Sequence, residues 1–216
     1  MLQNNLSIVD YGIGNIMSVR RGFEYCGANV CLASTEDEIL AADRLILPGV
    51  GAFRDGMDAL LRLGFLDAIL AKAQSGTPIL GICLGMQLLF SKSYEFGDTN
   101  GLGLIPGEVV GISKFLEDGH RLKIPNIGWR GLRYTEKGRS WENTILEDVT
   151  PEDEMYFTHS FTGLCDDEVN LLATSEYGGL DLAAVVCSQN IVGCQFHPEK
   201  SGEAGLRVLN SFVENS

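Results

Sequence analysis

The sequence lacks the features that would indicate a metal site or a nucleic-acid partner. Its six cysteines include no C-x-x-C pair, and its three histidines lie far apart, so neither residue type has the spacing of a metal site. No run of Lys and Arg is present. Only 16 basic residues stand against 29 acidic ones, and a formal net charge of −13 disfavours binding to a phosphate backbone. We therefore expect no metal and no nucleic acid, and a small polar substrate fits better.

The sequence also has no segment that predicts secretion or membrane insertion. The N-terminus has no basic region followed by an apolar stretch, and no apolar run approaches the roughly 20 residues of a membrane span. A cytoplasmic protein with reduced cysteines is therefore expected. With 216 residues and no linker, repeat or low-complexity tract, the chain is predicted to form one domain over residues 1–216.

Apolar segments in the first half alternate between strand-like and helix-like patterns. This alternation is typical of a parallel sheet covered by helices on both faces. From about Glu108 to Val186, short β-rich pieces predict additional antiparallel strands. The predicted fold class is α/β, with a mainly parallel central sheet flanked by helices. Expected strands are Leu6–Asp10, Val30–Ala33, Arg44–Leu47, Pro78–Ile82 and Ile191–Phe196, and expected helices are Ile16–Cys26, Phe65–Gln74, Leu84–Phe90 and Glu203–Val213.

The segment Gly81-Ile82-Cys83-Leu84-Gly85 lies between a predicted buried strand and a predicted helix. A nucleophile with a glycine two residues to either side is the pattern of a nucleophile elbow. Such a turn exposes the sulfur at the sheet edge, leaves the Leu84 N–H free for an oxyanion, and places a helix N-terminus where it favours a thiolate. A buried cysteine at a tight turn would show the same local pattern, so the elbow alone leaves both interpretations open.

A second motif, Phe196-His197-Pro198-Glu199-Lys200, follows the last predicted strand. Pro198 disfavours helical backbone at His197, and residues two apart in an extended chain project to the same side. Glu199 can then accept a hydrogen bond from one imidazole nitrogen while the other nitrogen faces a thiol. Alone, the motif is more simply a polar turn, but together with the elbow it supplies the missing base.

A third motif, Leu47-Pro48-Gly49-Val50-Gly51-Ala52-Phe53, also follows a predicted strand. The glycines around Val50 let the backbone approach a ligand and offer a second N–H to an oxyanion. The motif lacks the dinucleotide-binding fingerprint and the lysine of a Walker loop. By itself it is a weak indication, because glycine loops after strands are common in α/β folds.

The three motifs together resemble class I (triad) glutamine amidotransferases, a flavodoxin-like α/β family. The more restricted resemblance is to the glutaminase subunits of imidazole glycerol phosphate synthase. The similar blocks begin near Val9, continue to the last helix and keep the family's order. They are DYGIGN at 10–15, LPGVGAF at 47–53, GICLGMQLLF at 81–90, YFTHS at 156–160 and HPEKSGEAG at 197–205.

The resemblance implies roles for individual residues. Cys83 would attack the glutamine amide and form a thioester, His197 would transfer the protons, and Glu199 would orient His197. Gly51, with the Val50 peptide, and Leu84 would form the oxyanion hole, either directly or after a peptide flip near Val50. The amino-acid end of glutamine would be bound by Gln87, Glu95, Ser160 and Phe161. No cofactor is implied.

The resemblance also implies a partner, a cyclase subunit shaped as a (β/α)₈ barrel that receives the ammonia. Positions similar to the family's docking surface are Asn15, Trp129, Tyr156 and Lys200. The alternative is that Trp129 and Tyr156 are ordinary core aromatics and Lys200 is a solvated charge. The sequence departs from the family at Asn126 and Arg130, where His and Asn are usual. This departure lies near the docking face, not the triad, and leaves the acceptor reaction open.

Three alternatives follow. One is a paralogous glutaminase that supplies ammonia for amidine formation on a surface-polysaccharide sugar. Another is a hydrolase or redox protein with an elbow cysteine on a similar fold, although such proteins would not be expected to combine the elbow with H-P-E and PGVG. The third is a structural subunit without activity, which the intact set of motifs disfavours.

Overall fold

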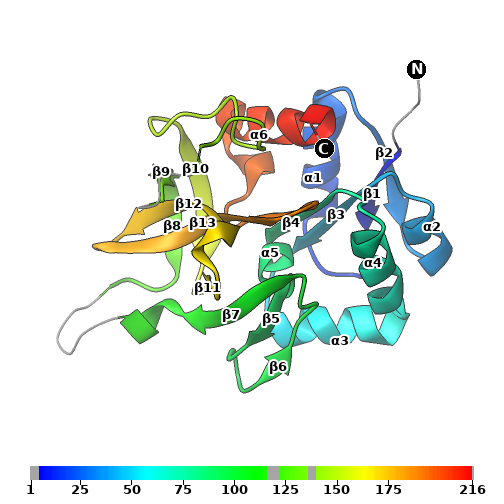
Figure 1. Cartoon of the computed structure of the whole chain (residues 1–216), viewed down its shortest axis with the longest axis horizontal. Helices are drawn as coiled ribbons and strands as arrows, with labels where there is room; N and C mark the ends of the chain where they lie inside the picture. The colour runs from blue at the N-terminus through cyan, green and yellow to red at the C-terminus, as the bar shows by residue number, and fades with distance from the viewer. Residues whose placement is uncertain (1–4, 116–121, 136–139, 216) are drawn as a thin grey trace.

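The computed structural model describes residues 5–115, 122–135 and 140–215 of the chain. A central eight-stranded sheet has the strand order β2-β1-β3-β4-β14-β13-β12-β9 (Figure 1). Strands β2, β1, β3, β4 and β14 pair in parallel, and β13, β12 and β9 extend the sheet by antiparallel pairing. The predicted α/β class with a mainly parallel core is confirmed. The strands are β1 (Asn5–Val9), β2 (Asn29–Ala33), β3 (Arg44–Gly49), β4 (Ile79–Cys83), β9 (Arg133–Tyr134), β12 (Leu171–Tyr177), β13 (Leu180–Ser188) and β14 (Ile191–Cys194).

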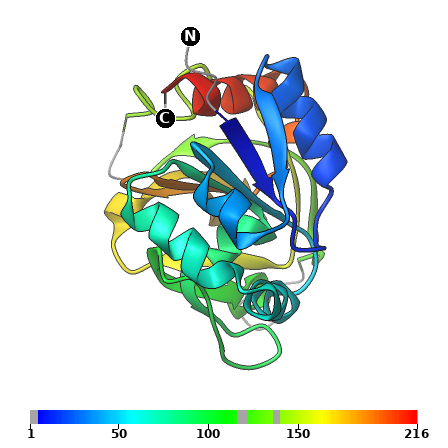
Figure 2. The ribbon, with the colours of Figure 1, turned by 90° about the vertical axis from the view of Figure 1, so that its right-hand side faces the viewer.

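Helices cover both faces of the sheet, as predicted, and Figure 2 shows the two layers on either side of the strands. Successive side chains of a strand point to opposite faces, so β3 contributes Ile46 to one core and Leu45 and Leu47 to the other. The first core lies under α1 and α6, where Phe23 and Phe212 meet edge to face. The second lies under α2 to α5. The helices are α1 (Ile16–Tyr25), α2 (Glu36–Leu40), α3 (Phe53–Leu63), α4 (Phe65–Gln74), α5 (Leu84–Leu88) and α6 (Gly202–Asn215).

Two smaller sheets stand beside the central one and account for much of the predicted antiparallel structure. A two-stranded sheet pairs β10 (Glu154–His159) with β8 (Asn126–Gly131). A four-stranded sheet has the order β11-β7-β5-β6. Its strands are β5 (Phe90–Ser93), β6 (Thr99–Asn100), β7 (Ile105–Gly111) and β11 (Phe161–Cys165), and the 3₁₀ turns are η1 (Ile112–Phe115), η2 (Glu168–Asn170) and η3 (Pro198–Lys200).

The structure corrects the predicted helix Leu84–Phe90. The helix ends at Leu88, and Phe90 begins β5, which pairs with β7. All five residues of α5 are buried, so this segment has no polar stripe from which a helix end could be recognised. The sequence interpretation also contained neither α2 nor α3.

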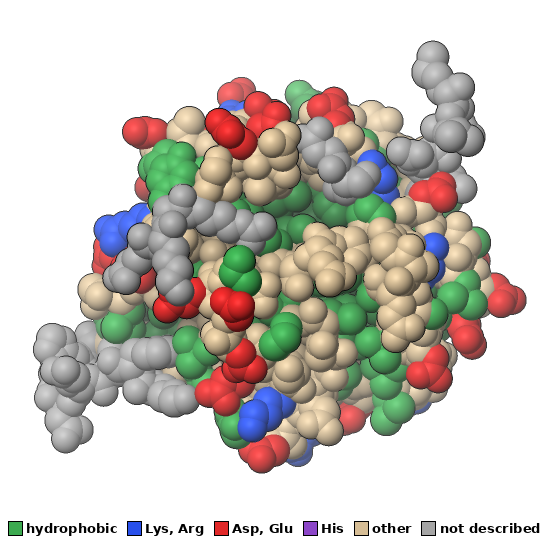
Figure 3. All heavy atoms as spheres, in the orientation of Figure 1, with side chains coloured by type: hydrophobic (Ala, Val, Ile, Leu, Met, Phe, Trp, Pro, Cys, Tyr) green, Lys and Arg blue, Asp and Glu red, His purple; other side chains and the backbone are tan. Residues whose placement is uncertain are grey.

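Acidic side chains are spread over the face of the molecule seen in Figure 3, with only scattered Lys and Arg between them. This distribution agrees with the formal charge of −13, and the described residues form no basic surface on that face. Within the described ranges, every helix is too short or too polar to cross a membrane.

Candidate active site

The three sequence motifs meet at one edge of the central sheet because they follow three neighbouring parallel strands. β3 and β14 flank β4, with Gly49 opposite Cys83 and Cys194 opposite Ile82. The carboxyl ends of parallel strands lie at the same sheet edge, where α/β proteins bind their ligands. The glycine loop after β3, the elbow after β4 and the H-P-E motif after β14 therefore surround a common space.

Cys83 has the strained backbone of a nucleophile elbow, with φ 55° and ψ −108°. The flanking glycines allow this turn. A Cβ on Gly81 would lie 2.7 Å from the backbone of Gly85, and a Cβ on Gly85 would lie 1.7 Å from the Leu47 carbonyl oxygen. The turn therefore excludes side chains at both flanking positions.

The Cys83 sulfur lies between two polar groups that contact it from other strands. Its thiol points at the Thr158 carbonyl oxygen, 3.9 Å away, and the Gln195 Nε2 donates toward the sulfur at 3.8 Å. Gln195 is fully buried, and the sequence interpretation did not include it. A signal was available, since Gln195 is a polar residue at the end of an otherwise apolar segment that leads directly to His197.

Glu199 accepts a hydrogen bond from His197 Nδ1 at 2.8 Å, with both side chains buried (3% and 1% exposed). The backbone of His197 is extended, as predicted, but Glu199 lies on η3 and not in a continuing strand. Because a carboxylate only accepts, Nδ1 carries the proton and Nε2 becomes the basic nitrogen. Nε2 is buried and has no hydrogen-bond partner among the described residues, so it is available for proton transfer.

Opposing effects determine the pKa of His197. Burial lowers the pKa, but the interactions with Cys83 and Glu199 outweigh it and raise the pKa to about 9. A raised pKa makes His197 a stronger acceptor for the thiol proton of Cys83.

The space between the three motifs is a cavity of about 520 Å³ that contains both Cys83 and His197. Its lining includes both predicted oxyanion residues and all four predicted substrate residues. These six residues come from four different segments of the chain. Sequence interpretation missed four further lining residues. The lining consists of Val50, Gly51, Cys83, Leu84, Gln87, Glu95, Phe96, Pro125, Thr158, His159, Ser160, Phe161 and His197.

Two predicted substrate residues also make contacts that hold the cavity wall. Gln87 Nε2 donates to the Phe161 carbonyl oxygen at 3.2 Å and to Gln195 Oε1 at 3.0 Å, which leaves Gln87 Oε1 for a ligand. Glu95 Oε2 accepts from the Phe53 N–H at 2.7 Å and so caps α3. Burial raises the pKa of Glu95, and the Phe53 N–H opposes this shift.

The predicted docking residues lie outside the cavity. Trp129 and Tyr156 are cross-strand partners on β8 and β10, with ring centroids 5.8 Å apart, and Lys200 Nζ lies 6.0 Å from the Tyr156 ring. Trp129 is 49% exposed, so its side chain is accessible to a partner. Asn15 is exposed and caps α1 by accepting from the Ser18 N–H.

Asn126 and Arg130, the two departures from the family pattern, are hydrogen-bonded to each other. Arg130 Nε donates to Asn126 Oδ1 at 2.7 Å, and the Arg130 guanidinium lies 4.5 Å above the Tyr177 ring. Asn126 is the residue after Pro125, which lines the cavity. The departures therefore form a matched pair beside the site.

Known proteins were compared with this chain. The family model for glutamine amidotransferase class-I matches residues 7–215. The imidazole glycerol phosphate synthase subunit HisH 1 of Legionella pneumophila (strain Lens) is 50% identical, over 98% of this chain and 99% of its own. The HisH subunit of Geobacillus thermodenitrificans is 43% identical, over 96% and 94%. The PurLQS structure from Thermotoga maritima has the same fold, with a TM-score of 0.73 at 20% identity and 98% coverage of both chains.

Both the family match and the full-length relatives fit the site described above, in which a cysteine elbow, a histidine and a glutamate follow adjacent strands. The chain belongs to the class-I glutamine amidotransferase family, and within it to the HisH subunits of imidazole glycerol phosphate synthase.

Proposed function

We propose that this chain hydrolyses glutamine to glutamate and ammonia and supplies the ammonia to a cyclase subunit of (β/α)₈ barrel shape. In this proposal residues 1–216 act as one cytoplasmic amidotransferase domain that needs no cofactor. The observation that carries the proposal is the free Nε2 of His197, held by Glu199 in the same cavity as the Cys83 sulfur. That arrangement supplies a nucleophile, a base and an orienting group.

The reaction proceeds in two steps. The Cys83 sulfur attacks the amide carbon of glutamine while His197 Nε2 takes the thiol proton, and the N–H groups of Leu84 and Gly51 stabilise the oxyanion. The proton then passes from His197 to the leaving nitrogen, so ammonia departs and a glutamyl thioester remains. His197 next deprotonates a water molecule, which attacks the thioester carbon, and glutamate leaves as the sulfur regains its proton.

Substrate selection is assigned to the wall opposite the elbow. The side chain of Glu95 faces the cavity with a buried carboxylate that suits an α-ammonium group, and Gln87 retains a free carbonyl oxygen. Ser160 and Phe161 supply the adjoining backbone. These groups recognise the amino-acid end of glutamine and hold the amide over Cys83.

The names of the relatives also indicate which reaction receives the ammonia. Both curated relatives are subunits of imidazole glycerol phosphate synthase, which favours histidine biosynthesis over amidine formation on a polysaccharide sugar. The exposed Trp129 near the cavity fits a partner that covers this side and receives the ammonia.

The test of the nucleophile is Cys83→Ala in the complex with the cyclase subunit. Glutamate release should fall by about 10⁴-fold or more, because among the described lining residues Cys83 alone carries a thiol. Cys31→Ala is the matched control, since Cys31 is exposed on β2 and should leave the rate unchanged. Substantial turnover by the Cys83 variant would refute the proposed mechanism.

A further inference from the structure

A line of side-chain hydrogen bonds runs from Arg130 on β8 to the backbone of the candidate glutamine cavity. Arg130 Nε donates to Asn126 Oδ1 at 2.7 Å, and Asn126 Nδ2 lies 2.9 Å from His159 Nε2. His159 Nδ1 lies 2.8 Å from the Phe161 carbonyl oxygen. Asn126 and His159 are directly opposite each other in the β8–β10 ladder, which fixes the central contact. The line thus joins a partly exposed cation to a residue of the cavity wall.

The chemistry of the two ends permits only one arrangement of protons along this line. A guanidinium is a donor only, so the Asn126 amide must turn its oxygen toward Arg130 and its NH₂ toward His159. The Phe161 carbonyl is an acceptor only, so His159 must carry its proton on Nδ1. Nε2 of His159 is then the acceptor that the Asn126 NH₂ requires, and every contact is satisfied.

Because the line is buried, a mismatched donor or acceptor along it would be costly. Asn126 is 1% exposed and His159 6%, so a mismatched donor or acceptor could not turn to water. Burial also lowers the pKa of His159 to about 4; the Phe161 carbonyl opposes this shift, while the charges of Arg130 and His197 reinforce it. His159 is therefore a neutral ring at pH 7, and its role here is that of a spacer with a defined tautomer.

The Phe161 carbonyl is held from two sides. It accepts from His159 Nδ1 and, at 3.2 Å, from Gln87 Nε2. His159, Phe161 and Gln87 all line the cavity. Any change that releases His159 would thus remove one of the two hydrogen bonds that orient the Phe161 carbonyl in the cavity wall.

We propose that Arg130 is a positioning residue for the glutamine cavity, acting through the Asn126 amide and the His159 tautomer on the Phe161 carbonyl. The proposal rests on the proposed function only in naming glutamine as the occupant. Arg130 touches neither the cavity nor the reacting atoms. It fixes the orientation of the Asn126 amide, which without the guanidinium can rotate and present its oxygen to His159 Nε2.

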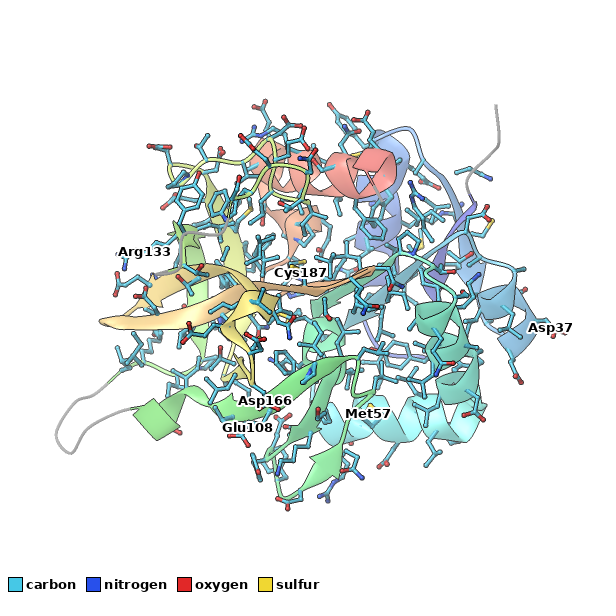
Figure 4. All side chains as sticks on the ribbon, viewed as in Figure 1. Asp37, Met57, Glu108, Arg133, Asp166 and Cys187 are labelled. Atoms are coloured by element: carbon cyan, nitrogen blue, oxygen red, sulfur yellow. The ribbon has the colours of Figure 1, made fainter. Side chains whose placement is uncertain are left out.

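The first test compares Arg130→Met with Arg130→Lys, each in a Cys83→Ala background that binds glutamine without consuming it. Glutamine affinity by calorimetry should fall about tenfold in the methionine variant, the effect of one misplaced hydrogen bond, and recover largely with lysine, which can still donate to Asn126. Arg133→Met is the control, because Arg133 lies on the edge strand β9, at the outer margin of the molecule (Figure 4). It pairs with Asp181 and not with Asn126.

Imidazole ¹⁵N spectra of the same variants give a readout that does not depend on activity. His159 should show a protonated Nδ1 and a bare Nε2 in the parent and in Arg130→Lys, and a mixture of protonation states in Arg130→Met. An unchanged His159 spectrum together with unchanged glutamine affinity in Arg130→Met would overturn the proposal. If the parent itself fails to bind glutamine, the proposed function fails, while the spectra still decide the role of Arg130.

A second variant, Asn126→Asp, keeps the shape and an acceptor for Arg130 but places acceptors against both ring nitrogens of His159. The ring should then take a second proton, so the pKa of His159 should rise well above 4 in an ¹⁵N titration. A His159 that remains neutral with its proton on Nδ1 at pH 7 in this variant would show that Asn126 does not determine its protonation.

Discussion

Cys83 and Glu199 both act on the proton affinity of His197, in a buried environment. Glu199 fixes which nitrogen of His197 is basic, through the 2.8 Å hydrogen bond to Nδ1. Burial alone would favour a neutral ring, but the interactions with Cys83 and Glu199 outweigh it and raise the pKa of His197.

Replacement of Cys83 by alanine should lower the pKa of His197 below about 9, because the sulfur is one of the groups that raise it. A ¹⁵N titration of the ring in wild type and Cys83→Ala measures this shift. Cys194→Ala serves as the control, since Cys194 is a buried cysteine of β14 that lies outside the cavity. An unchanged His197 titration in Cys83→Ala would mean that the two side chains are not coupled.

The same pKa has a consequence for stability. A ring whose pKa is higher in the folded state binds its proton more tightly there, so this interaction stabilises the fold fully below the unfolded value of about 6.5. The stabilisation is lost as pH rises through about 9. The fold therefore loses this stabilisation at alkaline pH, whereas the stabilisation from an ordinary paired carboxylate is lost at acidic pH.

Local motifs predicted the candidate catalytic residues, and contacts between distant segments were missed. Cys83, His197 and Glu199 are recognisable because their neighbours in sequence create the elbow and the H-P-E turn. Gln195 and His159 contribute through contacts with other elements, 112 residues away in the case of Gln195 and Cys83. Such pairings depend on strand order, which the sequence does not state.

At the scale of elements, the elbow is a close contact between the turn after β4 and the end of β3. Gly85→Ala would place a Cβ 1.7 Å from the Leu47 carbonyl oxygen, and backbone on both sides prevents relief. We expect a loss of about 3 kcal/mol or more in the free energy of unfolding, measured with denaturant, together with loss of glutaminase activity.

Gly76→Ala separates steric conflict from backbone strain. Gly76 has φ +81°, but a Cβ there would meet nothing within 4 Å. The free energy of unfolding should fall by only about 1 kcal/mol, which is the ordinary cost of a side chain on a residue in the left-handed conformation. Equal losses in the two variants would show that the contact with Leu47 does not limit the elbow.

Elements were predictable from sequence where their signals are local. The alternation of strands and helices up to β4 shows clear apolar patterns and glycine stops, whereas α3 begins at Phe53 after Ala52, which has no capping side chain. Its cap is Glu95, 42 residues further along the chain. For α2 a local signal was present and was overlooked: Thr35 accepts from the Glu38 N–H, and Glu38 accepts from the Ser34 N–H.

At the scale of the whole molecule, the cavity and the proposed docking surface are continuous through β8. Pro125 lines the cavity, and Ile127 and Trp129 follow it with exposed side chains (52% and 49%). Four residues of extended chain span about 13 Å. We therefore expect a partner seated on Trp129 to reach the cavity mouth and to receive ammonia without its release into bulk water.

Trp129→Ala should weaken the complex with the cyclase subunit by about 30-fold, the loss typical of a large aromatic anchor at an interface. The glutaminase rate that the partner stimulates should fall at subsaturating partner and recover when the partner is in excess, because the catalytic groups lie elsewhere. Tyr25→Ala is the control: Tyr25 is an exposed aromatic at the far end of α1 from Asn15. Calorimetric titration measures both affinities. Equal affinities of the Trp129 variant and wild type would place the docking surface elsewhere.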